Sequence, residues 1–129
     1  MSAEALGTFQ GAIALVEKSR ESFSLPYQGM ARLLVETKTA QALVFAQKAV
    51  ELEPNLDSNH STLARIYVLQ GKLPEAEQEL QAAVRLSPNK PVNHYVLSRL
   101  YRRLGRMEDA QTQLQTFQKL KATYDESPQ

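Results

Sequence analysis

Apolar residues recur every three or four positions along most of the chain, which is the spacing of one face of an α-helix. Within residues 57–90 this pattern forms two successive stripes. Leu63 and Ile66 belong to the first stripe, and Leu80 and Val84 belong to the second. No useful length of sequence alternates between apolar and polar residues, as a half-buried β-strand would. The pattern therefore predicts an all-α protein.

The chain also repeats itself with a period of 34 residues. Residues 57–90 align with residues 91–124 over their whole length. The identical pairs include Asn59 and Asn93, His60 and His94, Arg65 and Arg99, Tyr67 and Tyr101, and Gly71 and Gly105. Residues 23–56 match residues 57–90 mainly in their second halves. We therefore predict three consecutive units, of which the first has a diverged first half.

Each unit is expected to hold two helices joined by a turn. Gly71 and Gly105 follow the first apolar stripe of their units, and glycine readily adopts the left-handed conformation that ends a helix. Pro54 and Pro88 follow the second stripe, and proline cannot continue a helix. The sequence thus predicts helix pairs in each of the three units.

A further helix is expected before the first unit, within residues 1–22. Phe9, Ile13 and Val16, together with Leu6, would lie on one side of it. Two interpretations remain open: a helix that caps the first unit, or the remnant of a preceding repeat.

The unit 57–90 has small residues at its positions 8, 20 and 27, Tyr at position 11, Gly at 15 and Pro at 32. These residues are Ala64, Ala76, Ala83, Tyr67, Gly71 and Pro88. This pattern resembles the tetratricopeptide repeat. The resemblance implies an all-α, right-handed superhelical solenoid of antiparallel helix pairs with about seven helices. The expected parts are an N-terminal helix (1–22), repeat 1 (23–56), repeat 2 (57–90), repeat 3 (91–124) and a C-terminal tail (125–129). The first helix of repeat 1 departs from the pattern, because Pro26 and Gly29 replace the usual large aromatic residue and Leu.

The composition narrows the class of partner. The chain has 129 residues, 43% hydrophobic and 22% charged, which is typical of one globular domain. Its net charge of +1 gives no overall field that would attract nucleic acid or an acidic membrane, so we expect neither partner. No apolar stretch reaches the roughly 20 residues of a membrane span. Glu4 lies where an export signal would carry positive charge, so a cytoplasmic protein is expected.

The residues that could take part in catalysis do not form a catalytic motif. His60 and His94 occupy the same repeat position, and we interpret them as packing residues because helix packing distances would hold them about 10 Å apart, too far to share one metal ion. No nucleophile has a base at motif spacing, and no glycine-rich phosphate loop follows a strand. The chain also lacks cysteine. We therefore expect no catalysis, no metal and no cofactor.

The resemblance also implies where a partner binds. In this family the inner, concave face is built from positions 2, 5, 9, 12 and 13 of the first helix of each unit. The implied apolar contacts are Tyr27, Leu34, Val68, Leu69 and Tyr95, and the implied basic contacts are Arg65, Arg99, Arg102 and Arg103. We thus expect a protein or peptide ligand with acidic groups. The clamp with which some family members hold chaperone tails is not matched, because its positions hold Tyr27, Ala31, Thr62, Val92 and Val96.

An alternative function is self-assembly through the last helix. Such stacks usually end in a polar extra helix, and too few residues follow Lys121 to form one. Leu114, Phe117, Leu120 and Tyr124 would then be exposed and would form a homo-oligomer contact. A longer last helix that covers these residues itself is the other interpretation that the sequence leaves open.

Overall fold

The computed structural model describes residues 3–19 and 23–126 of the chain, and within these ranges it holds seven helices and no strand. In chain order the helices are α1 (Ala3–Ser19), α2 (Leu25–Leu34), α3 (Thr39–Leu52), α4 (Asp57–Leu69), α5 (Leu73–Leu86), α6 (Pro91–Arg103) and α7 (Met107–Glu126). The all-α repeat fold expected from the sequence is therefore confirmed. None of the described helices is both long enough and apolar enough to cross a membrane.

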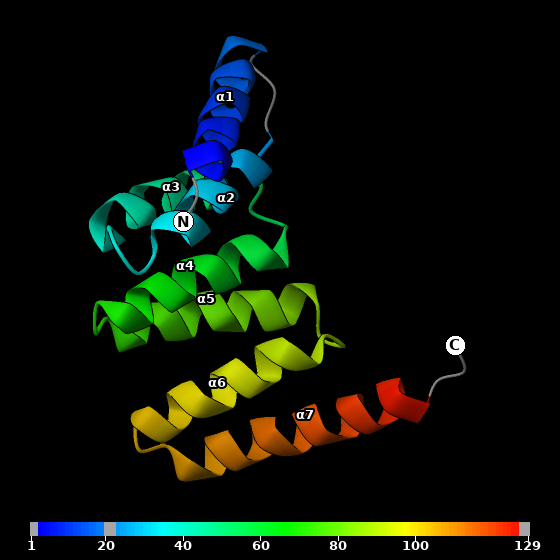
Figure 1. Ribbon diagram of the computed structural model, residues 1–129. Coiled ribbons are helices and arrows are strands. Elements are labelled where there is room, and N and C mark those ends of the chain that lie inside the picture. The colour runs from blue at the N-terminus through cyan, green and yellow to red at the C-terminus, as the bar shows by residue number, and fades with distance from the viewer. Residues whose placement is uncertain (1–2, 20–22, 127–129) are drawn as a thin grey trace.

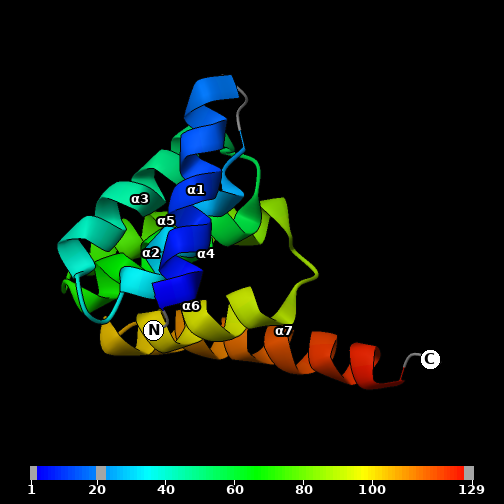
Figure 2. The ribbon, with the colours of Figure 1, turned by 45° about the horizontal axis from the view of Figure 1, so that its top comes forward.

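The helices form stacked antiparallel pairs. Figure 1 shows α4 with α5 above α6 with α7, and α2 with α3 at the other end of the stack. Helix α1 lies outside this regular order and runs steeply across α2 (Figure 2). The residues that precede α4 and α6, Leu56 and Lys90, are extended, so each new pair begins after a sharp change of direction.

Two glycines make the turns within the second and third pairs. Gly71 and Gly105 have φ angles of 75° and 76°, the left-handed region that residues with a Cβ atom avoid. The backbone N–H groups of Lys72 and Arg106 then donate to the carbonyl oxygens of Tyr67 and Tyr101, at 2.8 and 2.9 Å. These bonds satisfy carbonyl groups at the ends of α4 and α6 that lack a helical partner. The predicted helix ends at both glycines are thereby confirmed.

Small residues allow the helices of a pair to approach closely. Ala64, Ala76 and Ala83 are at most 1% exposed. Two apolar clusters fill the core, one around α1 to α4 and one around α4 to α7, and the half-buried Tyr67 packs against both. The core is thus continuous along the stack, as expected when each unit buries its apolar face against the next.

Polar contacts also join neighbouring units. Asp57 at the start of α4 accepts hydrogen bonds from the Lys90 ammonium at 3.0 Å and the Asn93 amide at 3.2 Å. Burial raises the pKa of Asp57, but these hydrogen bonds and the charge of Lys90 outweigh that effect, so its pKa lies below the ordinary value. Further along the stack, the guanidinium of Arg106 donates to the carboxylate of Glu77 at 2.7 Å.

The first unit has a different register from the other two. Helices α2, α4 and α6 start at residues 25, 57 and 91, whereas α3, α5 and α7 start at residues 39, 73 and 107. The first helix of unit 1 therefore begins two residues later than a 34-residue period places it. Burial agrees with this shift: Tyr27 and Leu34 are buried, as are Asn59 and Ile66, the residues 32 positions further along.

This register corrects two sequence expectations. Tyr27 and Leu34 were expected on the concave face, but they are only 4% and 3% exposed and belong to the core cluster. Leu6, Phe9 and Ile13 of α1 pack in that same cluster, so the core of unit 1 is completed from the N-terminal side. The side chain of Val16 lies outside the described residues.

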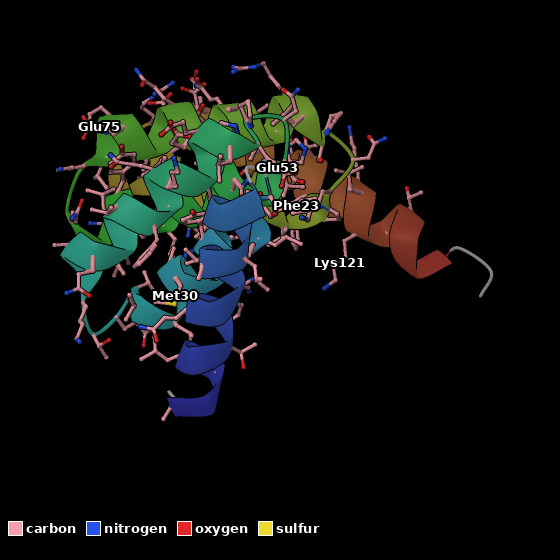
Figure 3. The ribbon with its side chains drawn as sticks, turned by 90° about the horizontal axis from the view of Figure 1, so that it is seen from above. Phe23, Met30, Glu53, Glu75 and Lys121 are labelled. Atoms are coloured by element: carbon pink, nitrogen blue, oxygen red, sulfur yellow. The ribbon has the colours of Figure 1, made fainter. Side chains whose placement is uncertain are left out.

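The end of the first unit is fixed by a buried polar network. The backbone N–H and the hydroxyl group of Ser24 donate to the carboxylate of Glu53 at 2.7 and 2.9 Å. In the view from above, Phe23 and Glu53 accordingly lie side by side (Figure 3). The amide of Asn59 donates to the hydroxyl oxygen of Ser24 and to the carbonyl oxygens of Ala49 and Glu53 at the end of α3, which ties α4 to this network.

Candidate functional site

A groove of about 470 Å³ lies between α4 and α6, and we call it the α4–α6 groove. Aliphatic side chains form much of its surface, including Val68 from α4 and Val92, Val96 and Leu100 from α6. Val92 and Val96 are 50% and 38% exposed, so these apolar groups are accessible to a ligand. The groove therefore offers an apolar surface that the fold itself leaves uncovered.

Cationic side chains line the same groove. Arg65 projects from α4, Arg99 and Arg103 project from α6, and Lys90 lies just before α6. Among the residues that line the groove in the described structure, none is acidic. An apolar surface bordered by cations fits a ligand that carries both aliphatic and acidic groups.

The groove continues into a more polar pocket between α2 and α4, of about 240 Å³, which we call the α2–α4 pocket. Its lining includes Arg32 from α2, Val35 just after α2, and a row of hydroxyl groups on α4: Ser58, Ser61 and Thr62. Ser61, Arg65 and Lys90 line both the pocket and the groove, so the two form one continuous depression.

A third hollow, of about 400 Å³, lies where α1 meets α2. Phe9 of α1 lines it together with Leu25, Gly29 and Leu33 of α2, and Arg32 connects it to the α2–α4 pocket. Gly29 is required here, because a Cβ atom at this position would clash with the ring of Phe9. In the register of α2, residue 29 corresponds to Ser61 of α4, 32 positions further along, and not to the large apolar position of the repeat.

The cationic residues of the α4–α6 groove differ in whether they already form an ion pair with an acidic residue. Arg65 pairs with Glu36 at 3.2 Å, and Lys90 pairs with Asp57 at 3.0 Å. Arg99 and Arg103 form no ion pair with any other residue that the structure describes. Charge is therefore least compensated at the α6 side of the groove.

The structure brings together four of the residues expected to bind a ligand: Arg65, Val68, Arg99 and Arg103. Leu69, Tyr95 and Arg102 are exposed but do not line the groove, and a role for them in binding stays a prediction. Tyr27 and Leu34 are buried, as described above.

Sequence reasoning did not single out two cations of the depression, Arg32 and Lys90. Arg32 occupies the last turn of α2, the helix whose register the 34-residue period misplaces by two residues. Lys90 precedes α6, so positions counted within a helix could not include it. The sequence does mark the segment that holds Lys90. This segment lies between Pro88 and Pro91, two prolines that separate α5 from α6, and Lys90 lines the groove.

The last helix differs from the expectation of an exposed apolar face. Leu114, Phe117 and Leu120 are half-buried rather than exposed. The ring of Phe117 packs against Tyr95 of α6 with 5.1 Å between the ring centres, and α7 extends over 20 residues, longer than α3 or α5. The side chain of Tyr124 lies outside the described residues. Self-association through this helix stays a prediction for which the burial of these residues gives no support.

The two histidines have equivalent hydrogen bonds. Nε2 of His60 lies 2.6 Å from the carbonyl oxygen of Pro54, and Nε2 of His94 lies 2.7 Å from that of Pro88. Their Nδ1 atoms contact the Glu79 carboxylate and the Gln113 amide oxygen, respectively. Each ring thus links the first helix of its pair to the second helix of the same pair and to the loop that precedes the pair. No cluster of three or more His, Asp or Glu residues suited to a metal ion lies within the described part of the chain.

A protein-family comparison matches residues 36–117 to the family described as anaphase-promoting complex, cyclosome, subunit 3. The match covers more than half of the 129 residues, so the chain belongs to this family of tetratricopeptide-type repeats. No curated protein sequence matches the chain.

Solved structures share the fold. The crystal structure of MamA superposes with a TM-score of 0.77 at 12% identity and covers 82% of this chain. YrrB, described as a TPR protein with an unusual peptide-binding site, gives a TM-score of 0.75 at 25% identity over 87% of this chain. The second TPR of Spaghetti (RPAP3), bound to the HSP90 peptide SRMEEVD, superposes with a TM-score of 0.71 at 16% identity. The match covers 75% of this chain and 91% of the Spaghetti chain. This chain spans 63% of MamA and 56% of YrrB.

Proposed function

We propose that the chain is a non-catalytic protein-interaction scaffold that binds a peptide segment of a partner in the α4–α6 groove. The observation that carries the proposal is the combination of exposed aliphatic groups with unpaired cations in one groove. Val92 and Val96 would take aliphatic side chains of the ligand, while Arg99 and Arg103 would take its acidic groups.

The likeness to two peptide-binding repeat proteins supports this proposal. YrrB is described as having a peptide-binding site, and the repeat domain of Spaghetti (RPAP3) binds an acidic HSP90 peptide. In this chain the corresponding chaperone clamp is absent from the sequence, so the acidic preference would rest on the groove arginines instead. The expected cytoplasmic location stays a prediction.

A selection from random peptides displayed on phage tests the proposal. Wild-type protein should enrich peptides that contain both aliphatic and acidic residues. The double variant Arg99→Glu with Arg103→Glu should lose these peptides, because it reverses the charge of the groove. The matched control, Lys119→Glu with Lys121→Glu, makes the same change of net charge on exposed residues of α7 and should retain them. Lys121 projects from α7 (Figure 3), and α7 lies at the end of the stack opposite to the first unit (Figure 1). Selected peptides that bind both double variants equally would refute the proposed groove.

A further inference from the structure

The α2–α4 pocket gathers three cations around one small space. Arg32 enters it from α2, Arg65 from α4 and Lys90 from the segment before α6. These residues lie far apart in the sequence, and the stacking of the units brings them to the same pocket. No acidic residue of the described chain lines the pocket. The pocket is therefore an electropositive recess beside the apolar groove.

The existing partners of these cations leave them available to a ligand. Arg32 forms no ion pair with another described residue. The pair of Arg65 with Glu36 is exposed, with 55% and 75% of the two side chains accessible, and such pairs stabilise a protein little. Lys90 is 46% exposed and holds Asp57 with one of its three hydrogens. An incoming anion can compete for all three.

One hydroxyl group adds a neutral donor. The amide of Gln28 donates to Ser58 Oγ at 2.8 Å, so the hydroxyl hydrogen of Ser58 is not needed for that contact. The hydroxyl groups of Ser61 and Thr62 instead donate to the carbonyl oxygen of Ser58. The donors for an anion are thus the side chains of Arg32, Arg65, Lys90 and Ser58.

We propose that the α2–α4 pocket binds a phosphoryl group carried by the peptide that occupies the α4–α6 groove. A carboxylate carries one charge and would have to compete with Glu36 for Arg65 on equal terms. A phosphoryl group carries nearly two negative charges and three acceptor oxygens, enough to engage three cations and one hydroxyl donor together. The pocket and the groove share Ser61, Arg65 and Lys90, so one ligand can reach both. This inference rests on the proposed function, because it requires a peptide in the groove.

Three degenerate peptide mixtures test the inference. They share the same randomised flanks and differ only at the central residue, which is phosphoserine, glutamate or serine. Immobilised wild-type protein should retain the phosphoserine mixture about tenfold better than the glutamate mixture, because of the additional charge and donors. The variant Arg32→Gln should lose this difference. The control Arg85→Gln also replaces an exposed arginine in the last turn of a helix, and it should keep the difference.

Each other outcome is decisive. Equal retention of the phosphoserine and glutamate mixtures would overturn the phosphoryl site and leave the acidic groove standing. Retention of none of the mixtures would overturn both proposals. A phosphoserine preference that persists in Arg32→Gln would place the phosphoryl group elsewhere and would overturn the inference.

A measurement on the wild-type protein covers the case in which Arg32→Gln does not fold. Inorganic phosphate is titrated against ¹⁵N-labelled protein, with sodium chloride at equal ionic strength as reference. Saturable changes in the amide signals of Ser58, Ser61 and Thr62 are expected. Changes that do not saturate, or that appear equally near Lys119 and Lys121, would contradict the pocket.

Discussion

The ring of Phe9 on α1 occupies the space that a Cβ atom of residue 29 on α2 would need. Gly29 leaves this space to the ring because it has no side chain. The ring of Phe9 also packs against the core cluster of the first unit, so this contact fixes the N-terminal helix on α2. The close packing of α1 on α2 therefore depends on the absence of a side chain at Gly29.

The substitution Gly29→Ala should accordingly destabilise the protein by about 1–3 kcal/mol, because the Phe9 ring must move. Urea unfolding followed by circular dichroism measures the change. The control Gly11→Ala lies on α1 in open space and should stabilise the helix by about 0.5–1 kcal/mol. In a Phe9→Ala background the cost of Gly29→Ala should disappear. A cost that is unchanged there would show that another contact excludes the Cβ atom.

Asp57 should make the stability depend on pH in the acid range. Its pKa is lower in the folded protein than the ordinary value of 3.8. A lowered carboxyl pKa contributes stability that is fully present above the unfolded pKa and is lost as the pH falls through the folded pKa. Asp57→Asn should therefore cost about 1 kcal/mol at pH 7, where it removes the charged partner of Lys90. The difference from wild type should shrink as the pH falls below the ordinary value of 3.8 and through the lower folded pKa.

Urea unfolding at several pH values measures this dependence. Glu51→Gln serves as the control, because the Glu51 side chain is 72% exposed and pairs only with the exposed Lys48 within the described chain. It should change the stability little at any pH. A difference between wild type and Asp57→Asn that does not shrink as the carboxylate of Asp57 becomes protonated would contradict its assigned role.

The histidines should act in stability rather than in binding. His94 is 6% exposed, and its ring meets the carbonyl oxygen of Pro88. The variant His94→Leu should cost about 1–3 kcal/mol, because the carbonyl oxygen of Pro88 and the side chain of Gln113 lose a partly buried hydrogen-bond partner. His60→Leu should cost less, because the His60 side chain is 12% exposed and water can replace part of its contacts. Thermal unfolding of the two variants compares them, and a larger loss for His60→Leu would contradict this explanation.

Glu36 should limit the affinity of the groove for acidic peptides. Its carboxylate pairs with Arg65, a cation that lines both the groove and the pocket. The variant Glu36→Gln frees Arg65 and should tighten the binding of a selected acidic peptide by about two- to fivefold. Glu75→Gln, on α5, removes the same charge elsewhere and should have no such effect (Figure 3). Fluorescence anisotropy of the labelled peptide measures both, and equal effects would point to net charge alone.

The sequence predicted α4 to α7 well because their two units repeat each other residue by residue. Gly71 and Gly105 mark equivalent turns, and Arg65 and Arg99 line the same groove. A period argument cannot detect a shift inside a unit that has diverged. This is why Tyr27 and Leu34 were expected on the surface although they are buried.

The exposure of the last helix could not be predicted for a different reason. Without a following helix, the sequence left two interpretations of Leu114 and Phe117 open: an exposed apolar face, or a longer last helix that is covered within its own unit. In the structure the Tyr95 ring covers part of Phe117 from within the same unit. Such a contact depends on the angle between α6 and α7, which hydrophobic spacing does not specify.

The proposed function places the ligand in the α4–α6 groove. The most direct measurement is a titration of ¹⁵N-labelled wild-type protein with an acidic peptide obtained from the phage selection. Amide signals of Val68, Val92, Val96 and Arg99 should shift and saturate together, while those on the outer side of α5 and α7 stay unchanged. Saturating shifts confined to α5, α7 or α1 would contradict the account.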